Sequence, residues 1–129
     1  MGKGKPGAGK TILVADDDPT VIATLSTYLD SLGYEVLSAA DGEAAMTTIE
    51  ESRPDLAVLD IAMPRASGII VARQIRAHSD PDVREMPVIM LTAKTDTRHE
   101  AYSNEAGARV FLSKPVALAE LAEKIRQLL

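Results

Sequence analysis

The sequence has 129 residues, the size of one domain, and is too short for a second. It has no cysteine, which excludes disulfide frameworks, thiol nucleophiles and cysteine-ligated zinc. The net charge is −5, and residues 1–10 hold three lysines and no acid, so residues 11–129 carry a net charge of −8. This negative charge and the small number of aromatic residues argue against direct nucleic-acid binding.

The chain opens with a match to a nucleotide-binding motif. Residues 4–11 read GKPGAGKT, which fits the phosphate-binding loop pattern G-x-x-x-x-G-K-[ST]. Such a loop needs a strand before it and a helix directly after its lysine. Here only three residues precede the motif, and a β-branched, apolar run follows it. We therefore predict a flexible Gly/Lys-rich leader at residues 1–10 and a folded domain at residues 11–129.

Short apolar runs alternate with amphipathic stretches along the rest of the chain. We predict strands at residues 12–15, 35–38, 56–59, 88–91 and 109–112. We predict a first helix that Asp18 caps, Pro19 begins and Gly33 ends, then helices at 42–51, 68–77, 98–106 and 118–128. This alternation favours an α/β fold, in which five helices cover both faces of a parallel sheet.

The composition of the strands predicts their order in the sheet. The runs ILVA, LAVL and VIML are apolar throughout, as strands covered on both faces should be, whereas EVLS and RVFL begin with a charge and resemble edges. The doubly wound order 2-1-3-4-5 satisfies both conditions with right-handed crossovers. The winding then reverses between the first and third strands, where ligands bind at the carboxyl ends.

Polar side chains follow four of the predicted strands. They are Asp16, Asp17 and Asp18 after the first strand, Asp60 after the third, Thr92 after the fourth and Lys114 after the fifth. Two carboxylates about 4 Å apart repel by roughly 4 kcal/mol at an effective dielectric of 20, so this cluster needs a cation. Ligands that offer only oxygen favour Mg²⁺ over zinc.

The same cluster suits phosphoryl chemistry. A carboxylate can attack a phosphoanhydride or phosphoimidazole, with Mg²⁺ and Lys114 binding the phosphoryl group and Thr92 donating a hydrogen bond to one of its oxygens. The structural alternatives are that Lys114 only neutralises a carboxylate and that Thr92 only caps a turn. We favour the chemical interpretation because residues suited to phosphoryl chemistry follow four of the predicted strands.

In order and spacing, these motifs resemble a response-regulator receiver domain of two-component signalling, like the chemotaxis regulators with their flavodoxin-like fold. The segments that carry the resemblance are ILVADDDP, PDLAVLDIAMPRASG, PVIMLTA and GARVFLSKP, and it covers residues 11–129. It implies that Asp60 is the phosphoacceptor. It also implies that Mg²⁺ is held by Asp16, Asp17, Asp60 and the backbone carbonyl of Ala62, and that Lys114 and Thr92 contact the phosphoryl group.

The resemblance further implies a signalling role rather than an enzyme, apart from self-phosphorylation and autodephosphorylation with Mg²⁺. A histidine kinase or phosphotransfer protein would be the donor. Phosphorylation would change the surface formed by residues 98–106, 109–112 and 118–128. The resemblance also allows a dimer formed through the helices at 98–106 and 118–128. Phe111 stands where the family places a switching aromatic, without the hydroxyl of the commoner Tyr.

Two rival interpretations remain. Residues 16–21, DDDPTV, also fit the D-x-D-x-T-[LV] signature of haloacid-dehalogenase-type phosphatases, but those enzymes need a further acidic pair after the lysine, and only Glu120 and Glu123 follow Lys114. A binding module of the same fold that takes no phosphate is the other rival.

The setting and the output of the domain are predicted only in outline. No apolar run approaches the ~20 residues that span a bilayer, so we expect a cytoplasmic protein without membrane contact. No output domain follows residue 129, so the chain would act on an unknown output protein or belong to a longer protein.

Overall fold

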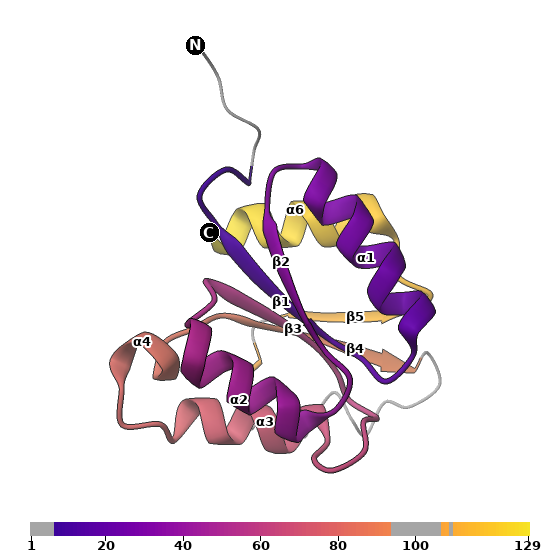
Figure 1. Cartoon of the computed structure of the whole chain (residues 1–129). Coiled ribbons are helices and arrows are strands. Elements are labelled where there is room, and N and C mark those ends of the chain that lie inside the picture. Colours follow the sequence, from indigo (N-terminus) through magenta and orange to yellow (C-terminus); the bar gives the residue numbers. More distant parts are fainter. Residues whose placement is uncertain (1–6, 94–106, 109) are drawn as a thin grey trace.

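The computed structural model describes residues 7–93, 107–108 and 110–129 (Figure 1). Its centre is a five-stranded parallel sheet in the order β2-β1-β3-β4-β5, as the sequence predicts. The strands are β1 (Thr11–Ala15), β2 (Glu35–Ala39), β3 (Leu56–Asp60), β4 (Val88–Ala93) and β5 (Val110–Lys114). The three apolar runs are the inner strands, and the two runs that begin with a charge are the edges.

Helices cover both faces of the sheet. They are α1 (Pro19–Ser31), α2 (Gly42–Ser52), α3 (Gly68–Arg76), α4 (Pro81–Arg84) and α6 (Leu118–Leu128). Figure 1 shows α1 and α6 on one face and α2 and α3 on the other. Within the described part of the chain, no helix is long and apolar enough to cross a membrane.

The inner strands supply both hydrophobic cores because successive side chains point to opposite faces. On β1, Ile12 and Val14 pack with α1 and α6, whereas Leu13 and Ala15 pack with α2 and α3. All four side chains are fully buried. The continuous apolar runs therefore reflect burial on two faces.

The first helix begins and ends where its sequence signals lie. The Asp18 side chain accepts a hydrogen bond from Thr20 N–H at 2.9 Å, and Pro19 occupies the first turn, where its missing N–H costs nothing. The helix ends at Ser31, and Gly33 follows with a φ of 98°, a conformation that glycine adopts without strain.

Some element boundaries differ from the predicted ones. The strands β3, β4 and β5 extend through Asp60, Ala93 and Lys114, because backbone hydrogen bonds of a parallel ladder continue past the last apolar side chain. The short helix α4 was not predicted, since four residues are too few for a periodic pattern. The helix predicted at 98–106 lies outside the described residues.

The described part of the predicted leader contacts the domain. Gly7 N–H donates to the Leu32 carbonyl at 2.9 Å, and the Lys10 carbonyl accepts from Glu35 N–H at 2.9 Å. A Cβ on Gly7 would lie 2.5 Å from the Tyr34 ring, so only glycine fits there. The strand β1 directly follows Lys10, where a phosphate-binding loop requires a helix.

Candidate functional site

Three carboxylates meet at the carboxyl end of the two central strands. Asp16 directly follows β1, Asp17 comes next, and Asp60 is the last residue of the neighbouring strand β3. One oxygen from each of the three lies within 4.8 Å of the others. Asp16 is fully buried and Asp60 is 5% exposed, whereas Asp17 faces solvent. The structure therefore brings together the three predicted acidic ligands.

Lys114, the last residue of β5, faces this cluster. Its Nζ atom lies 2.9 Å from Asp16 Oδ2 and 3.2 Å from Asp60 Oδ2. The strand β4 lies between β3 and β5, so the lysine side chain reaches past the end of β4 to meet both carboxylates. The peptide bond from Lys114 to Pro115 is cis.

The surroundings of Asp60 and Lys114 shift the pKa values of both side chains. Burial raises the pKa of the Asp60 carboxyl, and the nearby Asp16 charge raises it further, against the opposing effects of Lys114 and of a hydrogen bond from Ala62 N–H. Burial lowers the pKa of Lys114, but its hydrogen bonds and ion pairs with the two aspartates outweigh burial and leave that pKa above its usual value. The lysine is therefore a permanent cation at neutral pH.

The donor atoms fit a hard divalent cation such as Mg²⁺. Asp16 Oδ1 accepts a hydrogen bond from Asp18 N–H at 2.9 Å. Asp16 Oδ2 is buried, and the Lys114 Nζ atom contacts it at 2.9 Å. A buried carboxylate oxygen with spare acceptor capacity, beside two more carboxylates, is the ligand set that Mg²⁺ prefers.

The other predicted site residues lie on the same rim. Ala62 is exposed in the loop after β3, and its N–H donates to the Asp60 carboxylate. Thr92 lies on β4, one residue beyond Leu91, which pairs with Asp60 across the sheet, and it is only 7% exposed. Phe111 on β5 is half-buried and packs against the core beneath α2 and α3.

The sequence did not reveal how the loop of residues 61–67 is held. Gly68 N–H donates to the Ile61 carbonyl at 3.0 Å, and a Cβ on Gly68 would lie 2.4 Å from the Asp60 carbonyl oxygen. At the other side of the loop, Arg65 pairs with Asp41, which caps α2. The sequence signals for this loop are Pro64 within it and Gly68 at the start of α3, and neither indicates the contacts with α2.

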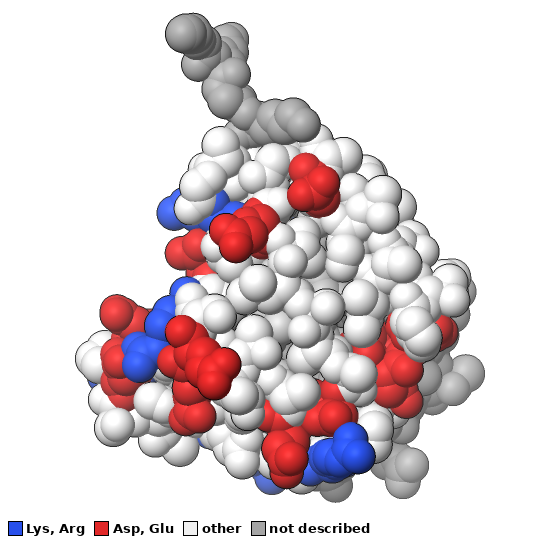
Figure 2. Space-filling view, viewed as in Figure 1, with Lys and Arg blue, Asp and Glu red and all other residues white. Residues whose placement is uncertain are grey.

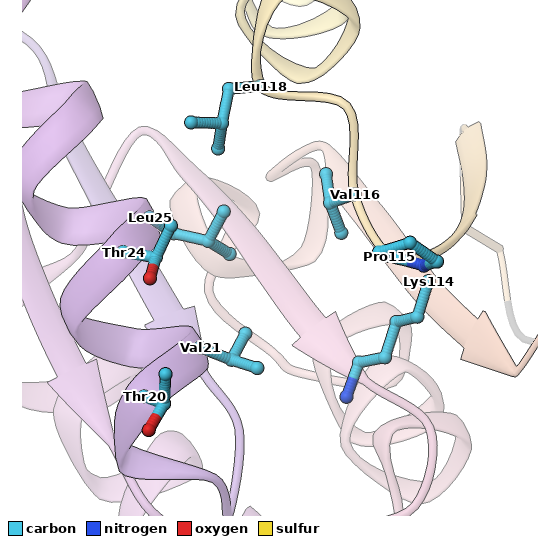
Figure 3. Close-up of a pocket in the computed structure, with 8 residues that line it drawn as sticks. All are labelled: Thr20, Val21, Thr24, Leu25, Lys114, Pro115, Val116 and Leu118. Carbon is cyan, nitrogen blue, oxygen red and sulfur yellow. The ribbon is translucent and has the colours of Figure 1, made fainter.

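A shallow groove adjoins the lysine. It has a volume of about 200 Å³ and separates α1 from the segment that links β5 to α6 (Figure 3). Figure 3 shows Val21 and Leu25 of α1 on one side and Val116 and Leu118 on the other, with the Lys114 side chain at one end. The groove thus joins an apolar surface to the charged rim.

The raised pKa of Asp60 predicts how stability depends on pH in the metal-free protein. A pKa above that of the unfolded chain means that folding favours the protonated carboxyl, so this contribution is present at low pH and is lost as the pH rises through the folded pKa. We expect the free energy of unfolding in urea to increase as the pH falls from neutral toward the ordinary pKa of an aspartate. Asp60→Asn should remove most of this increase. An equal increase in the wild type and the variant would contradict the assignment of this pH dependence to Asp60.

The order of the sheet and the charged groups at the carboxyl ends of its strands define a class, the doubly wound α/β domains with an acidic site on this rim. Comparison with known families agrees. The chain belongs to the response regulator receiver domain family, whose model matches residues 12–126. It is thus a receiver domain of the kind found in two-component response regulators.

Curated relatives and solved structures support this membership. The chain is 40% identical over 115 residues to the DNA-binding response regulator MtrA of Mycolicibacterium smegmatis, covering 89% of this chain and 48% of MtrA. It is 42% identical over 118 residues to the response regulator MprA of Mycolicibacterium vanbaalenii, covering 92% and 49%. The chain thus spans about half the length of the curated relatives it matches.

Two solved structures share the fold closely. The chemotaxis response regulator CheY4 of Vibrio cholerae has a TM-score of 0.85 at 28% identity, covering 93% of this chain and 98% of CheY4. A receiver domain from a histidine kinase of Syntrophus aciditrophicus has a TM-score of 0.84 at 33% identity, covering 93% and 89%.

Proposed function

We propose that this domain accepts a phosphoryl group on Asp60 from a histidine kinase or phosphotransfer protein, with Mg²⁺ bound at the acidic cluster. One observation carries the proposal. The Lys114 ammonium lies within 3.2 Å of Asp60 and within 2.9 Å of Asp16, on the rim where the carboxylates meet. A nucleophilic carboxylate, a cation site and a fixed ammonium are the parts that phosphoryl transfer needs.

The transfer is a substitution at phosphorus. A carboxylate oxygen of Asp60 forms the new P–O bond while the P–N bond to the donor imidazole breaks, and the bonding electrons leave with the nitrogen. Lys114 then stabilises a phosphoryl oxygen, and Thr92 donates a hydrogen bond to another. The same arrangement would support the later attack of water that releases phosphate.

Asp16, Asp17, Asp60 and the backbone carbonyl of Ala62 would hold the Mg²⁺. When bound, the ion neutralises charge on the carboxylates and on the phosphoryl oxygens. The residues of the chain supply the remaining parts. Asp16 is fixed by its hydrogen bond with Asp18 N–H, and Lys114 is fixed by its contacts with two carboxylates.

The donor would dock beside the rim, against α1. The exposed side of α1 carries Thr20, Ala23, Thr24 and Thr27, and in Figure 2 the surface over this helix is largely without acidic or basic side chains. The groove next to Lys114 is lined by apolar side chains (Figure 3). Such a surface suits a helical partner with an apolar contact face.

The signal would leave through β5 and its neighbours. Thr92 would move toward the phosphoryl group, and Phe111 would respond on the adjacent strand, so that the surface around β5 and α6 shifts between two packings. The predicted helix 98–106 belongs to this surface and lies outside the described residues. The output would be a partner protein or a further domain, and we expect the pathway to operate in the cytoplasm.

The phosphatase alternative has little support. Its additional acidic pair would have to come from Glu120 and Glu123, but Glu123 forms an ion pair with Arg126 on α6. Among the described residues, neither glutamate belongs to the cluster of Asp16, Asp17 and Asp60. A module without phosphoryl chemistry would not need a half-buried lysine that contacts two buried carboxylates.

Mass spectrometry after incubation with acetyl phosphate tests the function. With Mg²⁺, the wild-type protein should gain the mass of one phosphoryl group on the peptide that contains Asp60, and it should not do so when the metal is chelated. Asp60→Asn should remove the adduct. An adduct on Asp16 would indicate a dehalogenase-type enzyme, and no adduct on the wild type would indicate a module that takes no phosphate.

A further inference from the structure

The loop of residues 61–67 supplies backbone groups to the site. Ala62 N–H donates to the Asp60 carboxylate, and the Ala62 carbonyl is a proposed ligand of the metal. These residues lie between β3 and α3, outside any strand or helix. The position of Ala62 therefore depends on contacts that the loop makes with other parts of the molecule.

The start of α2 makes several of these contacts. Gly42 N–H donates to the Pro64 carbonyl at 3.3 Å. A Cβ on Gly42 would lie 2.0 Å from the Ala66 carbonyl oxygen, so the two backbones touch. Arg65 Nη1 donates to Asp41 Oδ2 at 2.8 Å. The loop is thus attached to α2 through two backbone contacts and one ion pair.

The ion pair holds two residues that are constrained for other reasons. Asp41 is the N-cap of α2, because its Oδ1 atom accepts from Ala44 N–H at 2.7 Å, and its side chain is only 13% exposed. Arg65 has a φ of 65°, a left-handed conformation that is unfavourable for a residue with a Cβ. The capping aspartate Asp41 is a fixed anchor, and Arg65 connects the strained turn of the loop to it.

We propose that the Asp41–Arg65 ion pair positions the loop of residues 61–67 and thereby tunes the affinity of the acidic site for Mg²⁺. Both are positioning residues, because they act through the backbone of Ala62. The effect on the metal rests on the proposed function. The effect on the loop does not, since the contacts exist in the metal-free protein.

The chain offers a closely matched control at the other end of α2. Arg53 also has a left-handed backbone, with a φ of 50°, and it pairs with Asp80, which is the N-cap of α4. This second pair lies beside the segment that leads into β3, at the amino ends of the strands and so at the opposite end of the sheet from the acidic cluster. In each pair, an arginine with a left-handed backbone contacts an aspartate that caps a helix. Only the Asp41–Arg65 pair involves the loop of residues 61–67.

Two substitutions separate the ion pair from its side effects. Asp41→Asn keeps an efficient N-cap but removes the charge. Arg65→Gly removes the side chain and relieves the left-handed backbone. The controls are Asp80→Asn and Arg53→Gly. Because each pair is treated alike, a general loss of stability would appear in both sets.

The first measurement is hydrogen exchange in the metal-free protein. Asp41→Asn and Arg65→Gly should increase the exchange rates of Gly42 N–H and Gly68 N–H, the two amides that donate to carbonyls of the loop. The controls should leave both rates unchanged. Unchanged rates in the Asp41 and Arg65 variants, or equal increases in all four proteins, would overturn the proposal whether or not the domain binds metal.

The second measurement is titration with Mg²⁺ by calorimetry. The Asp41 and Arg65 variants should bind about two- to fivefold more weakly than wild type, the effect expected for one exposed ion pair. At saturating Mg²⁺ their labelling rate with acetyl phosphate should return to the wild-type value, and the controls should match wild type throughout. Wild-type affinity in the Asp41 and Arg65 variants would overturn the link to the metal. A wild type that binds no Mg²⁺ would instead overturn the proposed function.

Discussion

Replacing Lys114 with methionine should destabilise the metal-free domain by about 3 kcal/mol, the lower end of the range for breaking a buried ion pair. Methionine is similar in length and uncharged, so the change removes mainly the charge. The ammonium is the cation within 3.2 Å of both Asp16 and Asp60, and these carboxylates are nearly inaccessible to water. Without it, two buried negative charges would face each other.

Urea denaturation with and without Mg²⁺ tests this prediction. Mg²⁺ should stabilise Lys114→Met more than wild type, because the metal and the ammonium neutralise the same carboxylates. The variant should nevertheless label slowly with acetyl phosphate, since the phosphoryl oxygens lose a partner. Lys10→Met, at an exposed position, is the control. Equal stability of Lys114→Met and wild type without metal would contradict the inferred charge balance.

An Asp16→Asn variant should bind Mg²⁺ at least about 100-fold more weakly than wild type, which corresponds to roughly 2.7 kcal/mol. Asp16 is the fully buried member of the cluster, and its Oδ2 atom lies 2.9 Å from the Lys114 Nζ atom. An amide retains the shape and one acceptor oxygen but loses the charge. Because a hard divalent cation depends on anionic oxygen ligands, the loss of this one should outweigh any gain from reduced repulsion.

Asp18→Asn is the matched control for this titration. Asp18 lies two residues away, is exposed and caps α1, a role that asparagine performs equally well. Calorimetry should therefore give Asp18→Asn the affinity of wild type. Similar weakening in both variants would show that the total acidity of the segment controls binding, against the assignment of Asp16 as a ligand.

Much of the fold could be predicted because its signals are local. The uniformly apolar runs identified the inner strands, and the charged first residues of 35–38 and 109–112 identified the edges. The cap and stop signals of α1 lie next to the helix ends in sequence. The acidic cluster followed from topology, because the carboxyl ends of neighbouring parallel strands meet at one rim.

The supports of the site could not be predicted in the same way. Arg65 and Asp41 are separated by 24 positions, and no periodicity links them. The close approach of Gly42 to Ala66 depends on how α2 packs beside the loop. The contact of Gly7 with Tyr34 likewise requires the folded sheet, and composition, from which we predicted a flexible leader, does not indicate it. Such contacts join distant segments, and their geometry appears only after folding.

The most direct test of the account is a crystal structure with Mg²⁺ and beryllofluoride, which mimics a phosphoryl group. We expect the ion to contact oxygens from Asp16, Asp17 and Asp60, the beryllium to bond to Asp60, and the Lys114 ammonium to contact a fluoride. A metal bound elsewhere, or beryllium on a different carboxylate, would contradict the proposed chemistry of this rim.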